Sequence, residues 1–301
     1  MKNFFEIAVI GGGPAGITAA VQASRYGADV AIFERGRLGG LIRYANMIEN
    51  FPGLYGKSGG AAAEEFASHA KLNGVRIVGE EVRMIRRSPA DNKFEIETPE
   101  GTWRAMSVIF AAGTKPRKIS APGLDSEILY SVESPEDFSG KSVAIVGGGD
   151  AAFDQALRVS KFAGSITILA RGKIHALPLL VDRCAATGIR FYENAEIQSA
   201  RRAGSAYVLR TSCGLPPVEI TADAIVAFPG REPNTDALSP EMRQEIFGSG
   251  EFLSVRAAIP GLYFAGDIIA GRHRQLAIAV GTGMLAALEA VVYVKRKEAE
   301  H

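Results

Sequence analysis

One glycine-rich pattern occurs twice in this chain, each time in the same surroundings. Gly11-Gly12-Gly13-Pro14-Ala15-Gly16 follows the apolar run 7–10, and Gly147-Gly148-Gly149-Asp150-Ala151-Ala152 follows the apolar run 143–146. Each apolar run predicts a buried strand, and each glycine run precedes a helical pattern (17–26, 153–162) and a second strand (29–33, 165–169). A lone G-x-G-x-x-G motif is weak evidence for nucleotide binding. Here the motif occurs twice, each time within the order strand, glycine turn, helix and strand, which is the context of a dinucleotide-binding unit.

Each glycine of the pattern has a physical task. Gly11 allows the tight turn, Gly13 leaves room for a pyrophosphate, and Gly16 lets helix and strand pack closely. The N-terminus of the helix that follows offers unpaired N–H groups and a partial positive charge to the phosphates. Gly147 and Gly149, with the adjacent Asp150 and Ala151, are expected to bind nucleotide in the second copy.

The two copies differ after their second strands. Glu34 lies 23 residues after Gly11, where an acid accepts hydrogen bonds from ribose hydroxyls. The equivalent position of the second copy is Ala170, followed by Arg171, and this pair favours a 2′-phosphate and hence NADPH over NADH. The preference is weak, because Arg35 occupies the matching place in the first copy and an ordinary surface arginine is the alternative for Arg171.

The composition argues against several other classes of protein. The 301 residues carry a net charge of +1 and are 47% hydrophobic, which favours neither a nucleic-acid partner nor disorder. The two cysteines, Cys184 and Cys213, form neither a disulfide scaffold nor a metal site, and two isolated thiols fit a reducing cytoplasm. The apolar stretch 276–294 contains two glycines, a threonine and a glutamate, so we expect a buried helix and no membrane span.

Further motifs appear in a fixed order along the chain. Besides the two glycine runs with Glu34, they are Leu38-Gly39-Gly40 with Glu49-Asn50-Phe51-Pro52-Gly53, the segment from Ala111 to Arg117, the segment from Gly261 to Asp267, and Arg274-Gln275 with Gly281-Thr282-Gly283. Together these motifs resemble the pyridine nucleotide–disulfide oxidoreductase superfamily, in particular its short thioredoxin reductase-like branch.

The resemblance implies an FAD site and an NAD(P)H site. In the family, the aspartate at Asp267 binds the flavin ribityl chain, and the helix start near Gln275 faces the isoalloxazine. Asn50, Asp267 and Gln275 are the polar residues expected nearest the flavin, while Tyr44 and Tyr130 are weaker candidates for a flavin face. The expected FAD residues are Gly11, Gly13, Pro14, Ala15, Gly16, Glu34, Arg35, Gly39, Gly40, Leu41, Asn50, Ala112, Gly113, Gly266, Asp267, Arg274, Gln275 and Leu276; those for NAD(P)H are Gly147, Gly149, Asp150, Ala151 and Arg171.

The resemblance also implies the architecture. We expect an α/β protein with two Rossmann-like, three-layer dinucleotide-binding domains, the second inserted in the first. The FAD domain comprises residues 1–114 and 229–301, and the NAD(P)H domain residues 118–228. The stretches 113–123 and 229–240 are expected hinges, residues 93–98 and 102–112 a hairpin, and the protein a cytoplasmic homodimer.

The chain departs from thioredoxin reductases at the redox centre. Tyr130-Ser131-Val132-Glu133 stands where those enzymes carry C-x-x-C, so a dithiol relay is excluded. With residues 135–138, this stretch resembles ferredoxin–NADP reductases of thioredoxin reductase type. Those enzymes usually add an aromatic segment that covers the flavin, whereas this chain ends at His301, which is expected to leave one flavin face open.

The phosphate-binding run is also altered. The family's H-R-R-x-x-x-R-A aligns with residues 170–177, where Arg171 is retained and two arginines are absent. Lys173 or His175 could substitute, although neither has the forked guanidinium.

The leading hypothesis is an FAD enzyme that takes hydride from NAD(P)H at flavin N5 and passes electrons directly to an acceptor, such as ferredoxin or flavodoxin. Two alternatives stay open. One is an NAD(P)H oxidase or a reductase of quinones or other small molecules. The other is a non-catalytic or partner-reduced flavoprotein with a degenerate NAD(P)H site.

Overall fold

A computed structural model describes residues 3–124, 127–214, 217–247 and 254–300. The chain forms two compact units. Unit 1 comprises Met1–Arg43, Glu49–Lys115 and Glu232–His301, and unit 2 comprises Tyr44–Ile48 and Pro116–Arg231. Tyr44–Ile48 belongs to unit 2 because its backbone is bonded to a helix there: Asn46 N–H donates to Asp154 Oδ2 at 2.9 Å.

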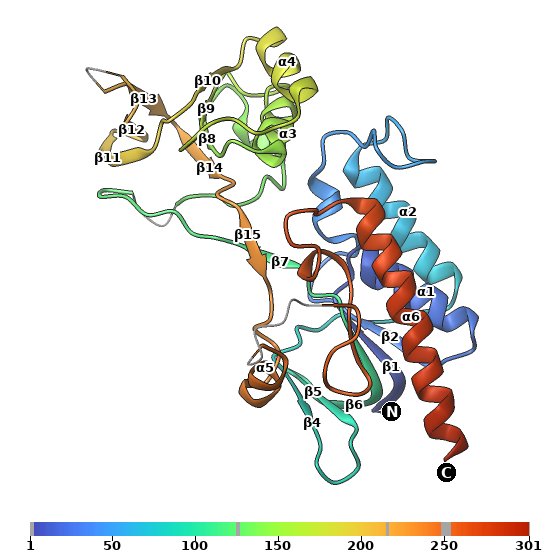
Figure 1. Cartoon of the computed structure of the whole chain (residues 1–301). Helices are drawn as coiled ribbons and strands as arrows, with labels where there is room; N and C mark the ends of the chain where they lie inside the picture. The colour runs from blue at the N-terminus through green and yellow to red at the C-terminus, as the bar shows by residue number, and fades with distance from the viewer. Residues whose placement is uncertain (1–2, 125–126, 215–216, 248–253, 301) are drawn as a thin grey trace. The chain divides into compact units, whose positions relative to one another are not determined.

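Unit 1 is built on a largely parallel sheet in which seven strands are described (Figure 1). The order is β3-β2-β1-β6-β5-β4, and β16 pairs with the carboxyl-terminal end of β6, beyond the residues of β6 that pair with β5. Strands β1, β2, β3, β6 and β16 are parallel, and β4 and β5 are antiparallel. The bounds are β1 (Phe4–Ile10), β2 (Val30–Phe33), β3 (Arg76–Val78), β4 (Met84–Arg87), β5 (Phe94–Thr98), β6 (Gly101–Phe110) and β16 (Leu262–Phe264).

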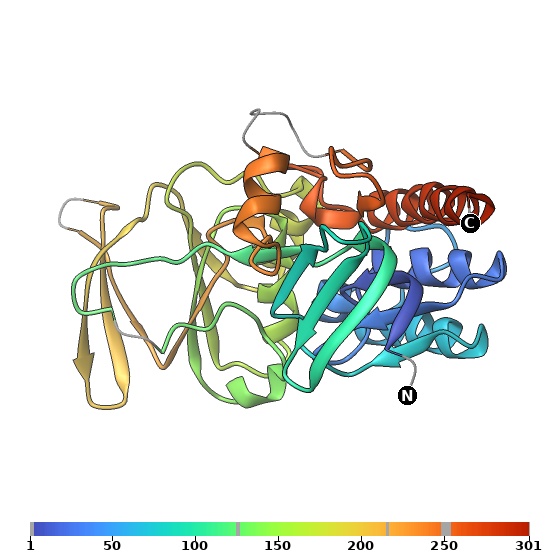
Figure 2. The ribbon, with the colours of Figure 1, turned by 90° about the horizontal axis from the view of Figure 1, so that it is seen from below.

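Both faces of this sheet are covered, which explains why β1 and β2 are almost wholly apolar. Helices α1 (Pro14–Arg25), α2 (Gly59–Leu72) and α6 (Leu276–Ala299) cover one face, as Figures 1 and 2 show. On the other face, side chains of β1, β2 and β6 pack in one apolar cluster with side chains of β4 and β5, the antiparallel end of the same sheet, and of α5 (Pro240–Phe247). The 3-10 turns η1 (Gly40–Tyr44) and η3 (Gly266–Ile268) lie in the connecting loops.

Helix α6 is long and apolar enough to cross a membrane by length and composition alone. In the structure, 44% of its most apolar window is buried. A Cβ on Gly283 would lie 2.2 Å from the carbonyl oxygen of Ala15, so α6 crosses α1 with almost no space between the backbones. A core helix that packs this closely passes the same length and composition test, so that test is weak support for a span.

Unit 2 repeats the parallel arrangement at smaller size. Its four-stranded sheet has the order β10-β9-β8-β14 and packs on α3 (Asp150–Val159) and α4 (Pro178–Ala186), with the 3-10 turn η2 (Pro135–Phe138) beside them. A three-stranded antiparallel sheet, β11-β12-β13, completes the unit. The bounds are β8 (Ser142–Val146), β9 (Ser165–Leu169), β10 (Arg190–Tyr192), β11 (Ile197–Ala203), β12 (Ala206–Thr211), β13 (Glu219–Ala222) and β14 (Ala224–Ala227).

The two chain segments that connect the units pair with each other as β7 (Thr114–Pro116) and β15 (Arg231–Pro233). Lys115 Nζ donates to both carboxylate oxygens of Asp236, at 2.7 and 2.8 Å, which ties these segments together. The stretches predicted as hinges overlap this ribbon, and hinge motion remains a prediction.

The predicted α/β fold class with two Rossmann-like units is confirmed, and the predicted hairpin exists as antiparallel β5–β6. Both first helices begin three residues earlier than the sequence pattern predicted, at Pro14 and Asp150. The reason is that Gly13 and Gly149 are themselves the extended N-cap residues, and proline suits a first helical position. The glycine turn therefore leads directly into the helix N-terminus, where an anion would bind.

Candidate functional site

The first glycine turn lies at the carboxyl end of β1, between β6 and α1. Gly11 has φ +105°, and a Cβ there would lie 2.4 Å from the carbonyl oxygen of Ala111. A Cβ on Gly16 would lie only 1.9 Å from the carbonyl oxygen of Gly11. Gly13, in contrast, has no atom within 4 Å of an added Cβ. Protein atoms therefore leave no space for a side chain at Gly11 and Gly16. Space remains beside Gly13, where the sequence predicts a pyrophosphate.

Glu34 follows β2 and holds this turn in shape. Its Oε2 accepts the N–H of Gly12 at 2.8 Å, and its Oε1 accepts the N–H of Gly36 at 2.9 Å. The carboxylate has further lone pairs for ribose hydroxyls. Arg35 points elsewhere and forms an exposed ion pair with Glu81 at 2.5 Å.

The loop after β2 returns to the turn. Gly39 N–H donates to the carbonyl oxygen of Gly12 at 2.7 Å, and a Cβ on Gly40 would lie 3.0 Å from Cα of Gly13. Leu41 follows, with its side chain partly exposed. The predicted residues Gly39 and Gly40 thus line the open side of the glycine turn.

Asn50 and Gln275 lie 225 positions apart in the sequence and meet in the structure. Asn50 Nδ2 donates to Gln275 Oε1 at 2.8 Å. Gln275 is also the N-cap residue of α6, so this pair joins the loop that contains Asn50 to the start of a helix, with Arg274 and Leu276 on either side. Two of the three polar residues predicted nearest the flavin are therefore neighbours.

The third, Asp267, lies in η3 directly after β16. The preceding Gly266 donates its N–H to Thr282 Oγ1 at 2.9 Å, and Thr282 donates its hydroxyl to the carbonyl oxygen of Ile278 at 2.8 Å. A Cβ on Gly266 would lie 2.8 Å from Cβ of Ala15, so Asp267 stands beside the first turn of α1. The sequence had marked Thr282 only as part of a motif, and its role as the support of Gly266 is visible only in the fold.

We expect Thr282→Val to lower the free energy of unfolding by about 1–2 kcal/mol, because the N–H of Gly266 loses its partner in a half-buried site. FAD dissociation should also become several-fold faster. Thermal unfolding and flavin release measure the two effects. Thr282→Ser keeps the hydroxyl and should restore both, whereas equal effects of the two variants would contradict the assignment.

The remaining predicted FAD residues, Ala112 and Gly113, follow β6. Gly113 has φ +64° and accepts the N–H of Asn234 at 3.0 Å. The predicted FAD residues thus follow β1, β2, β6 and β16, whose carboxyl ends share one edge of the sheet, or belong to loops that return to it. Ligands of open α/β sheets bind at that edge.

The second glycine turn lies in unit 2 between β8 and α3. A Cβ on Gly147 would lie 2.8 Å from the carbonyl oxygen of Phe228, so this turn is also tight. Asp150 Oδ1 accepts the N–H of Leu177 at 2.8 Å, which draws the loop after β9 toward the start of α3. Arg171 and Ala151 are exposed there, and Gly149 is the N-cap residue of α3.

The two tyrosines considered for a flavin face both belong to unit 2. Tyr130 Oη accepts the N–H of Ile119 at 3.0 Å, and the Lys118 ammonium lies 4.0 Å from the centre of its ring. The next residues, Val132 and Glu133, are bonded through their carbonyl oxygens to Arg158 at 2.6 and 3.1 Å. The segment that replaces the reductase C-x-x-C is thus tied to α3.

The two cysteines lie in different hydrophobic clusters of unit 2. Cys184 is buried against α3, where its thiol donates to the carbonyl oxygen of Phe153 at 3.5 Å. Cys213 packs against the cluster of the three-stranded sheet. Burial, with a smaller contribution from the Asp154 charge, raises the pKa of the Cys184 thiol to about 11. Cys184 is therefore a poor nucleophile at neutral pH.

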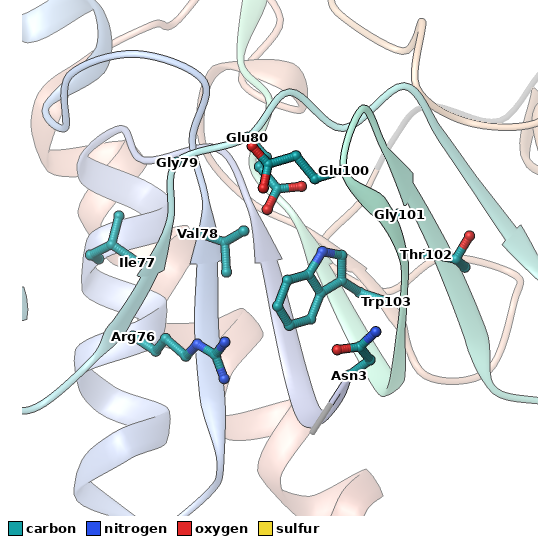
Figure 3. Close-up of a pocket in the computed structure, with 10 residues that line it drawn as sticks. All are labelled: Asn3, Arg76, Ile77, Val78, Gly79, Glu80, Glu100, Gly101, Thr102 and Trp103. Carbon is teal, nitrogen blue, oxygen red and sulfur yellow. The ribbon is translucent and has the colours of Figure 1, made fainter. Parts of the chain in front are cut away.

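A cavity of about 360 Å³ lies along β3 in unit 1 (Figure 3). Figure 3 shows Glu80 and Glu100 at one end and Trp103 along the wall. The Arg76 guanidinium lies 5.1 Å from the ring centres of both Phe5 and Trp103. None of the residues predicted to bind nucleotide lines this cavity. Among the described residues, no group of three or more His, Cys, Asp or Glu could hold a metal ion.

Comparison with known proteins agrees with this geometry. The family model described as "Pyridine nucleotide-disulphide oxidoreductase" matches residues 5–283. A thioredoxin reductase of Treponema pallidum is 29% identical, with 98% of each chain covered. A "34.2 kDa protein in rubredoxin operon" of Clostridium pasteurianum is also 29% identical, over 97% of this chain and 98% of its own. The crystal structure of Lactococcus lactis thioredoxin reductase matches with a TM-score of 0.87 and 26% identity, covering 97% of this chain and 99% of its own.

Proposed function

This chain belongs to the pyridine nucleotide-disulphide oxidoreductase family, and we propose that it is an FAD-dependent NAD(P)H oxidoreductase that uses no disulfide of its own. Electrons would pass from the flavin directly to an acceptor. The family implies the use of both FAD and a pyridine nucleotide. The observation that carries the proposal is the pair of glycine turns, each followed immediately by a helix N-terminus.

Unit 1 fits an FAD molecule. The open backbone at Gly13 would receive the pyrophosphate, Glu34 the ribose, and Asp267, Asn50 and Gln275 the flavin end. When bound, the flavin supplies the hydride and electron transfer, so the protein needs no nucleophile. We place the FAD domain at residues 1–114 and 229–301 and the NAD(P)H domain at 118–228, in a cytoplasmic homodimer.

The acceptor we propose is a small electron-transfer protein. The relative named for a rubredoxin operon supports a partner of this kind, as does the resemblance of residues 130–138 to ferredoxin–NADP reductases. Thioredoxin itself requires a dithiol in the reductase, and Cys184 and Cys213 are both free cysteines that lie in separate clusters.

The test is anaerobic mixing of the FAD-loaded protein with NADPH and, separately, NADH, while the visible flavin absorbance is followed. Fast bleaching by one nucleotide is expected, followed by rapid reoxidation on addition of a rubredoxin or ferredoxin. Faster reoxidation by oxygen or a quinone would favour an oxidase or small-molecule reductase. Bound FAD that neither nucleotide bleaches would overturn the proposal and leave a partner-reduced or non-catalytic flavoprotein.

We expect a Cys184→Ala/Cys213→Ser double variant to keep more than half of the wild-type rate of flavin reduction and reoxidation. Neither thiol takes part in the proposed electron path, and the thiol of Cys184 stays protonated at neutral pH. The rate with NADPH and the preferred acceptor measures this. A loss of turnover with flavin reduction intact would show that a cysteine carries electrons after all.

A further inference from the structure

The internal repeat continues beyond the second strand of each copy. Glu34-Arg35-Gly36-Arg37-Leu38-Gly39-Gly40 corresponds to Ala170-Arg171-Gly172-Lys173-Ile174-His175-Ala176, with the same offset that separates Gly11 from Gly147. The backbone confirms this correspondence. Gly39 N–H donates to the carbonyl oxygen of Gly12 at 2.7 Å, and His175 N–H donates to that of Gly148 at 2.9 Å. His175 therefore stands where the first copy has a glycine.

This exchange changes the surroundings of the third glycine of the run, Gly13 in the first copy and Gly149 in the second. An added Cβ on Gly13 meets nothing within 4 Å, whereas an added Cβ on Gly149 would lie 3.1 Å from His175 Nε2. Two carbons of the imidazole would follow at 3.7 and 3.8 Å. The ring thus covers the backbone of Gly149, the position at which a missing side chain lets a pyrophosphate approach. The His175 side chain is itself exposed and can reach a ligand there.

The orientation of the ring assigns different tasks to its two nitrogens. Nδ1 lies 3.4 Å from the carbonyl oxygen of Lys173, which can only accept a hydrogen bond, so this contact favours the tautomer with the proton on Nδ1. Nε2 faces Gly149. In the neutral ring Nε2 then has no hydrogen to donate, and only the imidazolium can donate Nε2–H to an anion.

The charges around the ring come from two sides. Arg171 and Lys173 belong to the same loop, while Asp150 lies in the first turn of α3 and accepts the N–H of Leu177. Glu193, after β10, accepts the N–H of Ile174 at 2.7 Å through its Oε1. Two arginines of the related phosphate-binding run are absent here, so this loop has fewer fixed positive charges to offer a phosphate.

We propose that His175 binds the pyrophosphate of the nicotinamide nucleotide as an imidazolium, so that nucleotide binding takes up a proton. This inference rests on the proposed function, which places the nucleotide at the second glycine turn. Histidine is the side chain whose charge changes between pH 5 and 8, so binding tightens as the pH falls through this range. NAD⁺ and NADP⁺ share the pyrophosphate, so the effect is the same for both.

The test is calorimetric titration of the oxidised, FAD-loaded protein with NAD⁺ and with NADP⁺, which cannot reduce the flavin. Titrations at pH 6 and pH 8, in two buffers of different protonation enthalpy, count the protons taken up. Wild-type protein should bind both nucleotides about tenfold more tightly at pH 6 than at pH 8, in line with the strength of a charge-assisted hydrogen bond. Such a change over two pH units corresponds to an average uptake of about half a proton per bound nucleotide. His175→Asn should lose the uptake and bind about tenfold more weakly at pH 6, with little change at pH 8.

Two comparisons make the outcomes distinct. His69→Asn removes another exposed histidine, at the end of α2 in unit 1, and should leave both affinities unchanged. The 2′-phosphate of NADP⁺ itself changes charge over this pH range. It does so equally for both proteins, so the ratio of their affinities at one pH does not contain this contribution.

Each remaining result is decisive. If wild-type protein binds neither nucleotide at either pH, the proposed function fails. If it binds them but His175→Asn is indistinguishable from wild type, only the role of His175 fails. Tighter binding by His175→Asn would mean that the ring obstructs the turn, and an effect limited to NADP⁺ would place His175 at the 2′-phosphate; both contradict this proposal.

Discussion

A Gly16→Ala variant is expected to lose several kcal/mol of folding free energy, whereas Gly13→Ala should fold normally and fail to hold FAD. The added methyl at position 16 would lie 1.9 Å from the carbonyl oxygen of Gly11, so α1 and β1 must separate. Overpacking of this kind costs about 1–3 kcal/mol or more, a large part of the 5–15 kcal/mol that stabilises a typical protein. The same methyl at position 13 meets no protein atom.

At position 13 the methyl instead occupies the space that the pyrophosphate is expected to fill. We therefore expect FAD affinity to fall at least 100-fold with the unfolding temperature of the apoprotein unchanged. Chemical denaturation of the apoproteins and fluorescence titration with FAD separate the two effects. If Gly13→Ala bound FAD as tightly as wild type, the pyrophosphate would lie elsewhere and the assignment of unit 1 would be wrong.

Replacing Glu34 by alanine is expected to weaken FAD binding about 100-fold and to lower the free energy of unfolding by about 1–3 kcal/mol. The N–H groups of Gly12 and Gly36 lose their hydrogen-bond acceptor, and with it the glycine turn loses the side-chain contact that stabilises its conformation. The ribose hydroxyls of FAD would lose their proposed acceptor as well. Glu34→Gln retains one carbonyl oxygen but turns an amide NH2 toward a donor, so its effect should be intermediate.

Glu81→Ala is the matched control for this series. Glu81 is a carboxylate at a similar place in unit 1, paired with Arg35, but the side chains of the two residues are 50% and 71% exposed. Exposed ion pairs contribute about 0–1 kcal/mol, so Glu81→Ala should change neither FAD affinity nor stability measurably. FAD titration and thermal unfolding of the four proteins test the order. Equal losses of FAD affinity and stability in Glu34→Ala and Glu81→Ala would show a general effect of charge and no specific role for the hydrogen bonds of Glu34.

Much of the fold could be predicted because it depends on local patterns. The apolar runs before Gly11 and Gly147 can satisfy burial on two faces only as central parallel strands, and the glycines permit only a tight turn next to them. The starts of α1 and α3 were predicted three residues late, because apolar periodicity marks the buried face of a helix and does not show where the N-cap lies.

The site was only partly predictable, and the reason is distance along the chain. Asn50 and Gln275 were singled out separately, but no pattern within either segment shows that their side chains bond to each other. The support of Gly266 by Thr282 was not predicted, because a threonine in an apolar helix is an ordinary residue until its neighbour is known.

The sequence by itself determined the doubly repeated dinucleotide-binding architecture, the family and the absence of a C-x-x-C, since these depend on residue type and spacing alone. Only the tertiary structure decided that Gly13 is open while Gly149 lies under an imidazole. The two turns are almost alike in sequence, and the difference comes from a loop that returns to each turn from beyond the next strand. Which side chain such a loop places on a ligand site depends on its backbone path, and that path is set by packing between distant segments.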